Sequence, residues 1–211
     1  MPADLIHLVR HGEVHNPDGI LYGRLPEFHL SELGQAMARV SAESLHAAGA
    51  PVGKVVSSPL IRTVESAAPW AELFGLDASI DERLIEPTNR FEGFKMSDRL
   101  RQPASWPALV NPLLPSWGEH YTSIARRMLA AITDAWASVD GGDVVLVSHQ
   151  LPIWMVHRSL AGRSLPHDPR TRRCSLSSIT SLSRIGAGFV EVNYQEPAAG
   201  LSAGAVDRGA V

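Results

Sequence analysis

Cysteine and lysine are scarce in this chain of 211 residues. Cys174 is the only cysteine, which excludes a disulfide framework and a cysteine-based metal site. Lys54 and Lys95 are the only lysines, so the other 17 basic residues are arginine. Arginine carries the planar fork that suits carboxylate and phosphate groups, although a composition bias of the whole genome would give the same ratio.

Long apolar runs and a strong charge of either sign are also absent. No run approaches the ~20 apolar residues that cross a bilayer, and the first residues lack the pattern of a signal peptide. We therefore expect a cytoplasmic protein. Nineteen basic and 22 acidic residues give a net charge of −3. This balance favours neither a nucleic-acid nor a membrane partner, while a local basic pocket stays compatible with it.

Short apolar runs alternate with helical stretches along the chain. Strands are predicted at residues 5–9, 54–57 and 143–148, and a terminal hairpin at 178–184 and 188–194. Helices are predicted at 31–48, 58–74, 119–139 and 152–160. Ser31 and Ser58 are the expected N-caps of the first two. This order predicts an α/β fold, a three-layer αβα sandwich whose mostly parallel central sheet has an antiparallel edge.

Two segments depart from this regular alternation. Residues 77–118 contain five prolines, a pattern typical of short helices or a lid over a binding cleft, or of a plain long connection. After Tyr194 the residues are small and include no aromatic, so we expect a disordered tail at 196–211. The length otherwise fits one domain.

Charged side chains follow three of the predicted strands. Arg10 and His11 end the first, Arg62 comes shortly after the second, and His149 ends the last. Ligands of open α/β sheets bind beyond the carboxyl ends of the strands, so these four residues meet at one rim if the strands are neighbours. Two arginines and two histidines make a pocket for a tetrahedral dianion: arginine binds its oxygens, and a neutral imidazole can attack phosphorus.

Arg10 and the two histidines each have an alternative role. Arg10 could pair with Glu13 or Glu65 in a purely structural network. The two histidines could instead bind a metal, but arginines at the same rim would repel a divalent cation, and no carboxylate cluster joins them. We therefore expect neither a metal nor another cofactor.

Five short motifs follow one another along the chain. The first is Arg10-His11-Gly12-Glu13, and the others are Leu-Ser-Glu-Leu-Gly at 30–34, Ser-Ser-Pro-Leu-Ile-Arg at 57–62, Arg-Leu-Ile-Glu at 83–86 and Val-Leu-Val-Ser-His at 145–149. Together they resemble the histidine phosphatase superfamily, branch 1, also called phosphoglycerate-mutase-like, and its phosphatase-type members. The resemblance covers about residues 5–194 and implies a catalytic domain over 1–195.

The resemblance implies a role for each matched residue. His11 would be the nucleophile that takes the phosphoryl group as a phosphohistidine. Glu86 would protonate the leaving alcohol and then help to deprotonate water. The phosphate oxygens would be held by Arg10, Arg62, His149 and Asn16. Because side chains bind the phosphate, this mechanism requires no metal.

Some positions depart from the family pattern or lie beside it. Asn16 is one position closer to Arg10 than the usual asparagine, and Gln150 replaces a glycine, where it would narrow the pocket or donate to a phosphate oxygen. Arg24 and Arg90 are weaker candidates for binding a substrate carboxylate or second phosphate, against the alternative of solvated loop arginines.

Three functions fit these residues. The first is a metal-independent phosphomonoesterase that acts on a small phosphorylated metabolite. A phosphoglycerate mutase-type isomerase would use the same phosphohistidine, but such mutases usually carry a longer insertion between the residues that match Glu86 and His149, which are only 63 positions apart here. The third, a non-catalytic phospho-ligand binder, has no use for a proton donor such as Glu86. The substrate and the oligomeric state, a homodimer included, stay open.

Overall fold

A computed structural model describes residues 1–95, 98–99, 101–102 and 118–207 of the chain. Its centre is a sheet with the strand order β3-β2-β4-β1-β5-β6. The strands are β1 (Leu5–Arg10), β2 (Val52–Ser57), β3 (Ala78–Ile80), β4 (Asp143–Ser148), β5 (Ile179–Ile185) and β6 (Gly188–Gln195). The helices are α1 (Glu32–Ala47), α2 (Ile61–Phe74), α5 (Tyr121–Ala137) and α6 (Gln150–Leu160), with short 3-10 helices η1 (Glu82–Leu84), η3 (Pro169–Thr171) and η4 (Ala199–Gly204).

The sheet is parallel in its centre and antiparallel at one edge. Strands β3, β2, β4 and β1 pair in parallel, whereas β5 runs antiparallel to both β1 and β6. This confirms the predicted fold class. The sequence patterns did not predict β3, because this edge strand has only three residues and all of them are exposed, so it carries no alternating apolar signal.

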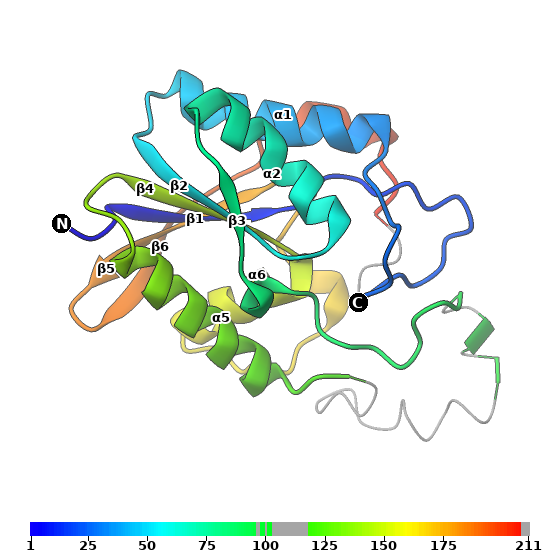
Figure 1. The fold of residues 1–211 in the computed structure, drawn as a ribbon. Coiled ribbons are helices and arrows are strands. Elements are labelled where there is room, and N and C mark those ends of the chain that lie inside the picture. The colour runs from blue at the N-terminus through cyan, green and yellow to red at the C-terminus, as the bar shows by residue number, and fades with distance from the viewer. Residues whose placement is uncertain (96–97, 100, 103–117, 208–211) are drawn as a thin grey trace.

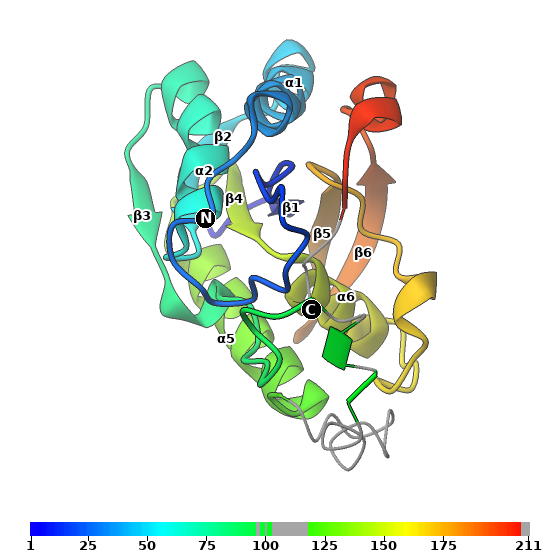
Figure 2. The same cartoon turned by 90° about the vertical axis from the view of Figure 1, so that its right-hand side faces the viewer.

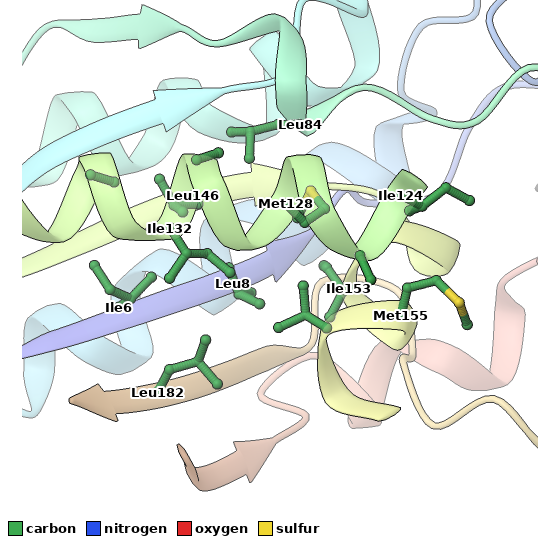
Figure 3. Packing of buried hydrophobic residues seen from close by; sticks show 14 of the residues in the cluster. Ile6, Leu8, Leu84, Ile124, Met128, Ile132, Leu146, Ile153, Met155 and Leu182 are labelled. Carbon is green, nitrogen blue, oxygen red and sulfur yellow. The ribbon is translucent and has the colours of Figure 1, made fainter. Parts of the chain in front are cut away.

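Helices cover both faces of the sheet. Figure 1 shows α1 and α2 on one side and α5 and α6 on the other. Successive side chains of a strand point to opposite faces. Ile6 and Leu8 of β1 therefore pack into the core against α5 and α6 (Figure 3), while Val9 packs into the core under α1 and α2. Burial on both faces explains why the central strands are mostly apolar, and the buried His7 of β1 is paired with Asp143 of β4.

The two helices that follow the first strands begin differently from one another. Ser31 caps α1 as predicted, because its hydroxyl oxygen accepts a hydrogen bond from the Gly34 N–H at 2.9 Å. The cap predicted for α2 is wrong: this helix begins at Ile61, and its N-cap residue, Leu60, makes no side-chain capping bond. The Ser58 hydroxyl lies instead 2.8 Å from His149 Nε2.

The segment after β6 corrects the prediction of a disordered tail for residues 196–207. Helix η4 and its flanks bring Ala198, Leu201 and Ala205 against Met37 of α1 and against Leu176. Figure 2 shows η4, in red, on the α1 side of β5 and β6. The prediction of a tail rested on the small size of these residues. Their spacing, however, places the apolar ones on one face, which packs against α1. Residues 208–211 lie outside the described residues.

Two further observations bear on the sequence predictions. Four of the five prolines in the stretch that suggested a lid fall in residues 103–117, which lie outside the described residues. Within the described ranges, none of the helices combines the length and the hydropathy that membrane crossing needs.

Candidate active site

The carboxyl ends of three neighbouring strands bring the predicted residues together. Strands β2, β4 and β1 are adjacent, with Arg10 paired to Ser148 in register. Just beyond the strand ends, the His11 N–H donates to the Ser148 carbonyl at 3.1 Å, and the Ser58 N–H donates to the Val147 carbonyl at 3.0 Å. The four residues Arg10, His11, Arg62 and His149, here called the Arg–His cluster, are all buried at this rim.

The loop after β1 is held against the two helices that follow it. Gly12 lies so close to Gly34 of α1 that a Cβ atom on Gly12 would stand 2.2 Å from the Gly34 carbonyl oxygen. The Gly12 N–H donates to Ser66 Oγ at 3.1 Å, and that hydroxyl donates to the Arg62 carbonyl at 2.7 Å. Only glycine fits this contact, which fixes His11 relative to Arg62.

His11 is a neutral imidazole with a defined proton position. Its Nδ1 lies 2.7 Å from the Gly12 carbonyl oxygen, which can only accept, so Nδ1 carries the proton. Burial, with the charges of Arg62 and Arg10, lowers the pKa of His11 well below its usual value. Nε2 therefore holds a lone pair at neutral pH, which is the form a nucleophile needs.

His149 is also neutral, with the opposite proton position. Its Nδ1 lies 3.3 Å from Arg62 Nη2, which can only donate, so the imidazole proton sits on Nε2 and faces the Ser58 hydroxyl. Burial and the charge of Arg62 lower the pKa of His149 well below its usual value. The rings of His11 and His149 meet edge to face, with centroids 5.2 Å apart.

The two arginines retain unpaired donors inside the site. Arg62 Nη2 donates to the Gly23 carbonyl at 2.6 Å, and its guanidinium lies 4.8 Å from the centre of the Tyr22 ring. In the described part of the chain, Arg62 Nε, Arg62 Nη1 and Arg10 Nε are buried without a hydrogen-bond partner. Unsatisfied charged donors are costly, so their presence at one place is typical of an anion-binding site.

Glu86 places a carboxyl group beside these donors. It follows η1, which Ser148 fastens to β4 by donating to the Leu84 carbonyl at 2.7 Å. Glu86 Oε2 lies 3.4 Å from His149 Nδ1, and Oε1 has no hydrogen-bond partner among the described residues. Burial raises the pKa of Glu86 to about 7, against the opposing effect of nearby arginines, Arg62 first. The group can therefore both donate and accept a proton near neutral pH.

Comparison with known proteins agrees with this geometry. A model of the histidine phosphatase superfamily (branch 1) matches residues 6–196. The chain belongs to this superfamily. A relative from Mycobacterium tuberculosis, "Uncharacterized protein Rv0525", is 49% identical over 203 residues, which cover 94% of this chain and all of the relative.

Two further proteins are similar to this chain over most of its length. The solved structure of a mycobacterial glucosyl-3-phosphoglycerate phosphatase with VO3 is 25% identical, has a TM-score of 0.73, and covers 89% of this chain and 97% of that one. "Probable phosphoglycerate mutase GpmB" of Yersinia pestis is 29% identical over 183 residues, covering 82% of this chain and 83% of the relative.

The weaker predicted residues lie at the edge of this candidate site or beyond it. Arg24 is adjacent to it, since its Nε donates to the Glu86 carbonyl at 2.5 Å. Gln150 begins α6, and its Nε2 lies 3.4 Å from the Cys174 carbonyl. The Asn16 amide bonds both backbone groups of Ile20 and so closes its own loop. Arg90 is exposed, and its role, like that of Asn16, stays a prediction.

Glu13 and Glu65, the partners suggested for a structural network of Arg10, are not the ones it has: Arg10 Nη1 donates to the Cys174 carbonyl at 2.7 Å, and both terminal nitrogens donate to Asp207. The Asp207 carboxylate oxygens lie 2.8 Å from Nη1 and 2.5 Å from Nη2 of Arg10. Glu13 instead accepts from Ser31 and the Val206 N–H, and Glu65 accepts from the Leu30 N–H. No sequence signal could have found this pair, because 197 positions separate its members.

Sequence reasoning also gave no site role to three side chains that the fold brings to the cluster. Ser58, within the motif at 57–62, was interpreted as a cap but faces His149. Tyr22 lies buried under Arg62. Arg172 lies near enough to Glu86 for its charge to act on the pKa of that carboxyl group, and it donates to Gln150 Oε1 at 3.4 Å and to His167 Nε2 at 2.9 Å. Only the motif around Ser58 offered a usable signal.

Replacing Arg62 with lysine tests whether its forked donors hold phosphate. Lysine keeps the charge but loses the planar fork, so we expect kcat/KM for a phosphate ester to fall about 10²-fold or more. The matched control is Arg39→Lys, because Arg39 pairs with Glu72 on the exposed surface of α1 and α2. Equal activity of Arg62→Lys and Arg39→Lys would contradict the assignment.

Proposed function

We propose that the protein is a metal-independent phosphomonoesterase that acts through a phosphohistidine on a small phosphorylated metabolite. One observation carries the proposal: a neutral His11 with a lone pair on Nε2 shares a buried site with unpaired guanidinium donors and with a carboxyl group whose pKa is about 7. These are a nucleophile, an anion site and a proton donor.

The first step transfers the phosphoryl group to the protein. His11 Nε2 forms a bond to phosphorus while the bond from phosphorus to the ester oxygen breaks. Protonated Glu86 gives its proton to that oxygen, which leaves as an alcohol. The Arg10 and Arg62 donors stabilise the charge on the three equatorial oxygens, while the Nδ1 lone pair of His149 helps to hold Arg62 Nη2 in place.

The second step returns the free enzyme. Glu86, now a carboxylate, accepts a proton from water as the water oxygen attacks phosphorus. The bond between phosphorus and His11 Nε2 breaks, and inorganic phosphate leaves. Asn16 would add a further contact to the phosphate oxygens.

The cationic surroundings also support a route without a metal. Arg62 faces the same space as the two imidazoles, since its Nη2 lies 3.3 Å from His149 Nδ1. A divalent cation at the imidazoles would meet this fixed positive charge, whereas a phosphate dianion would be attracted by it.

A mutase is the second candidate, favoured by the similarity to "Probable phosphoglycerate mutase GpmB". A mutase returns the phosphoryl group to another hydroxyl of the substrate instead of passing it to water. The similarity to a phosphatase structure over 97% of that chain supports hydrolysis, as does the modest separation of Glu86 and His149.

Release of phosphate from an aryl phosphate in the presence of a chelator tests the proposal. We expect turnover without added metal and no loss with the chelator, because side chains supply the positive charge. Loss of activity with the chelator would contradict a metal-independent mechanism. Tight binding of inorganic phosphate without any turnover would identify a phospho-ligand binder instead.

Incubation with 3-phosphoglycerate separates hydrolysis from isomerisation. We expect phosphate release to exceed formation of the 2-isomer. Formation of the 2-isomer at a rate above hydrolysis would make the protein a mutase, with the same residues at the nucleophilic and acid positions.

A further inference from the structure

The chain places one of its own carboxylates on the proposed phosphate site. Asp207 Oδ1 and Oδ2 lie 2.5 and 2.8 Å from the two terminal nitrogens of Arg10. Arginine binds a phosphate in the same way, with one oxygen of the phosphate on each of two guanidinium nitrogens. The Arg10 side chain is fully buried, whereas the Asp207 side chain is 41% exposed. The carboxylate therefore lies on the solvent side of Arg10.

The segment that carries Asp207 is anchored on the protein just before it reaches Arg10. Residues Ala198, Leu201 and Ala205 of the η4 region pack near Met37 of α1. Only Val206 lies between this anchor and Asp207, and its N–H donates to Glu13 Oε1 at 2.6 Å. An anchor so close keeps the carboxylate at a high effective concentration beside Arg10.

The tip, defined as Val206 and Asp207, can leave without unfolding the rest of the segment. Two side-chain bonds to Arg10 and one backbone bond to Glu13 hold it, and the apolar contacts belong to the residues before it. Because the Asp207 side chain is partly exposed, it has a path toward water.

A phosphate dianion would make interactions that the Asp207 carboxylate does not make. It carries up to two negative charges and more oxygens. In the described part of the chain, the hydrogen bonds of Asp207 go to Arg10, while Arg62 Nε and Nη1 are left unpaired. A phosphate that reaches both arginines therefore has an advantage over the carboxylate at the same place.

We propose that the tip is an internal competitor for the phosphate site, which holds Arg10 in the resting protein and is displaced by a dianionic phosphate ester. This inference rests on the proposed function, because it takes Arg10 as a phosphate ligand. Its consequence is that the chain lowers its own apparent affinity for substrate by the fraction of molecules whose tip is docked.

Asp207→Asn tests the competition without requiring turnover. Asparagine keeps the shape but loses the charge that pairs with Arg10. If about nine-tenths of the molecules have a docked tip, the variant binds inorganic phosphate about tenfold more tightly, measured by titration calorimetry. With an aryl phosphate, KM falls and kcat is unchanged. Asp207→Glu restores the charge and moves both constants back toward those of the unmodified protein.

The control replaces a carboxylate that pairs with an arginine far from the site. Glu72→Gln removes the exposed pair with Arg39 between α2 and α1, and it should leave phosphate affinity unchanged. Hydrogen exchange gives a second readout: added phosphate should speed exchange of the Val206 amide, because displacement of the tip breaks its bond to Glu13.

The outcomes distinguish a failure of the competition from a failure of the proposed function. Equal phosphate affinity of Asp207→Asn and the unmodified protein would overturn the competition and leave the phosphatase proposal intact. Weaker phosphate binding by Asp207→Asn would also overturn it, because Asp207 would then support the site. Phosphate binding by neither protein would contradict both claims, since Arg10 would not be a phosphate ligand.

Discussion

Replacing His11 with alanine is expected to abolish phosphate release, with a loss of at least about 10⁴-fold in kcat. The reaction as proposed passes through a bond between phosphorus and His11 Nε2, and no water can take that place in a two-step transfer. The expected intermediate is an acid-labile phosphohistidine. Rapid quenching in base followed by mass spectrometry should detect it in the unmodified protein and not in His11→Ala.

The control for this substitution is His46→Ala. His46 is an exposed histidine in the last turn of α1, at the opposite end of that helix from the Gly12–Gly34 contact, and its removal should leave kcat unchanged. A phosphoprotein that survives in His11→Ala, or turnover close to that of His46→Ala, would assign the nucleophile to another group.

Glu86→Gln is expected to slow hydrolysis of an alkyl phosphate by about 10² to 10⁴-fold. An alkoxide is a poor leaving group and needs the proton that Glu86 gives. An activated aryl phosphate leaves readily without a proton, so its rate should fall much less. Comparison of kcat/KM for the two substrates therefore measures the role of Glu86 as the acid. An equal loss for both would remove that role.

The pH dependence provides an independent measure of the same group. Burial raises the pKa of Glu86 to about 7, so Glu86 holds its proton below this value and loses it as the pH rises. With an alkyl phosphate, kcat/KM should therefore decline above pH 7 in the unmodified protein. Glutamine does not titrate, so this decline should vanish in Glu86→Gln.

The matched control is Glu82→Gln, four positions earlier in the same segment. Glu82 is exposed on η1, and its replacement should preserve both the rate and the decline above pH 7. A decline that persists unchanged in Glu86→Gln would assign it to the substrate phosphate or to another residue of the protein.

Local signals in the sequence determined the outline of this protein. The mainly apolar runs at 5–9 and 143–148 became β1 and β4, because a strand buried on both faces needs apolar side chains on both. Ser31 caps α1 because a hydroxyl can satisfy a free N–H of the first turn wherever that turn forms. The residues that follow the strands, Arg10, His11 and His149, could be placed at one rim by the rule for parallel sheets.

Long-range contacts decided what the sequence could not. The cap predicted at Ser58 failed because its hydroxyl meets His149, which lies 91 positions away. The segment predicted to be a tail packs on the protein as far as Asp207, because Ala198, Leu201 and Ala205 contact α1 and the Asp207 carboxylate pairs with Arg10. The contacts of Ser58 with His149 and of Asp207 with Arg10 depend on the order in which the strands pair, and no local sequence pattern predicts that order.

The scarcity of cysteine excluded a disulfide framework, while the five motifs identified the superfamily and its chemical groups, because these depend on which residues follow which strands. The protonation of those groups required the tertiary structure. Burial keeps His11 neutral and brings the pKa of Glu86 to about 7, and the Gly12 carbonyl sets which nitrogen of His11 is free. Desolvation arises from everything packed around a residue, so it exists only once the chain has folded.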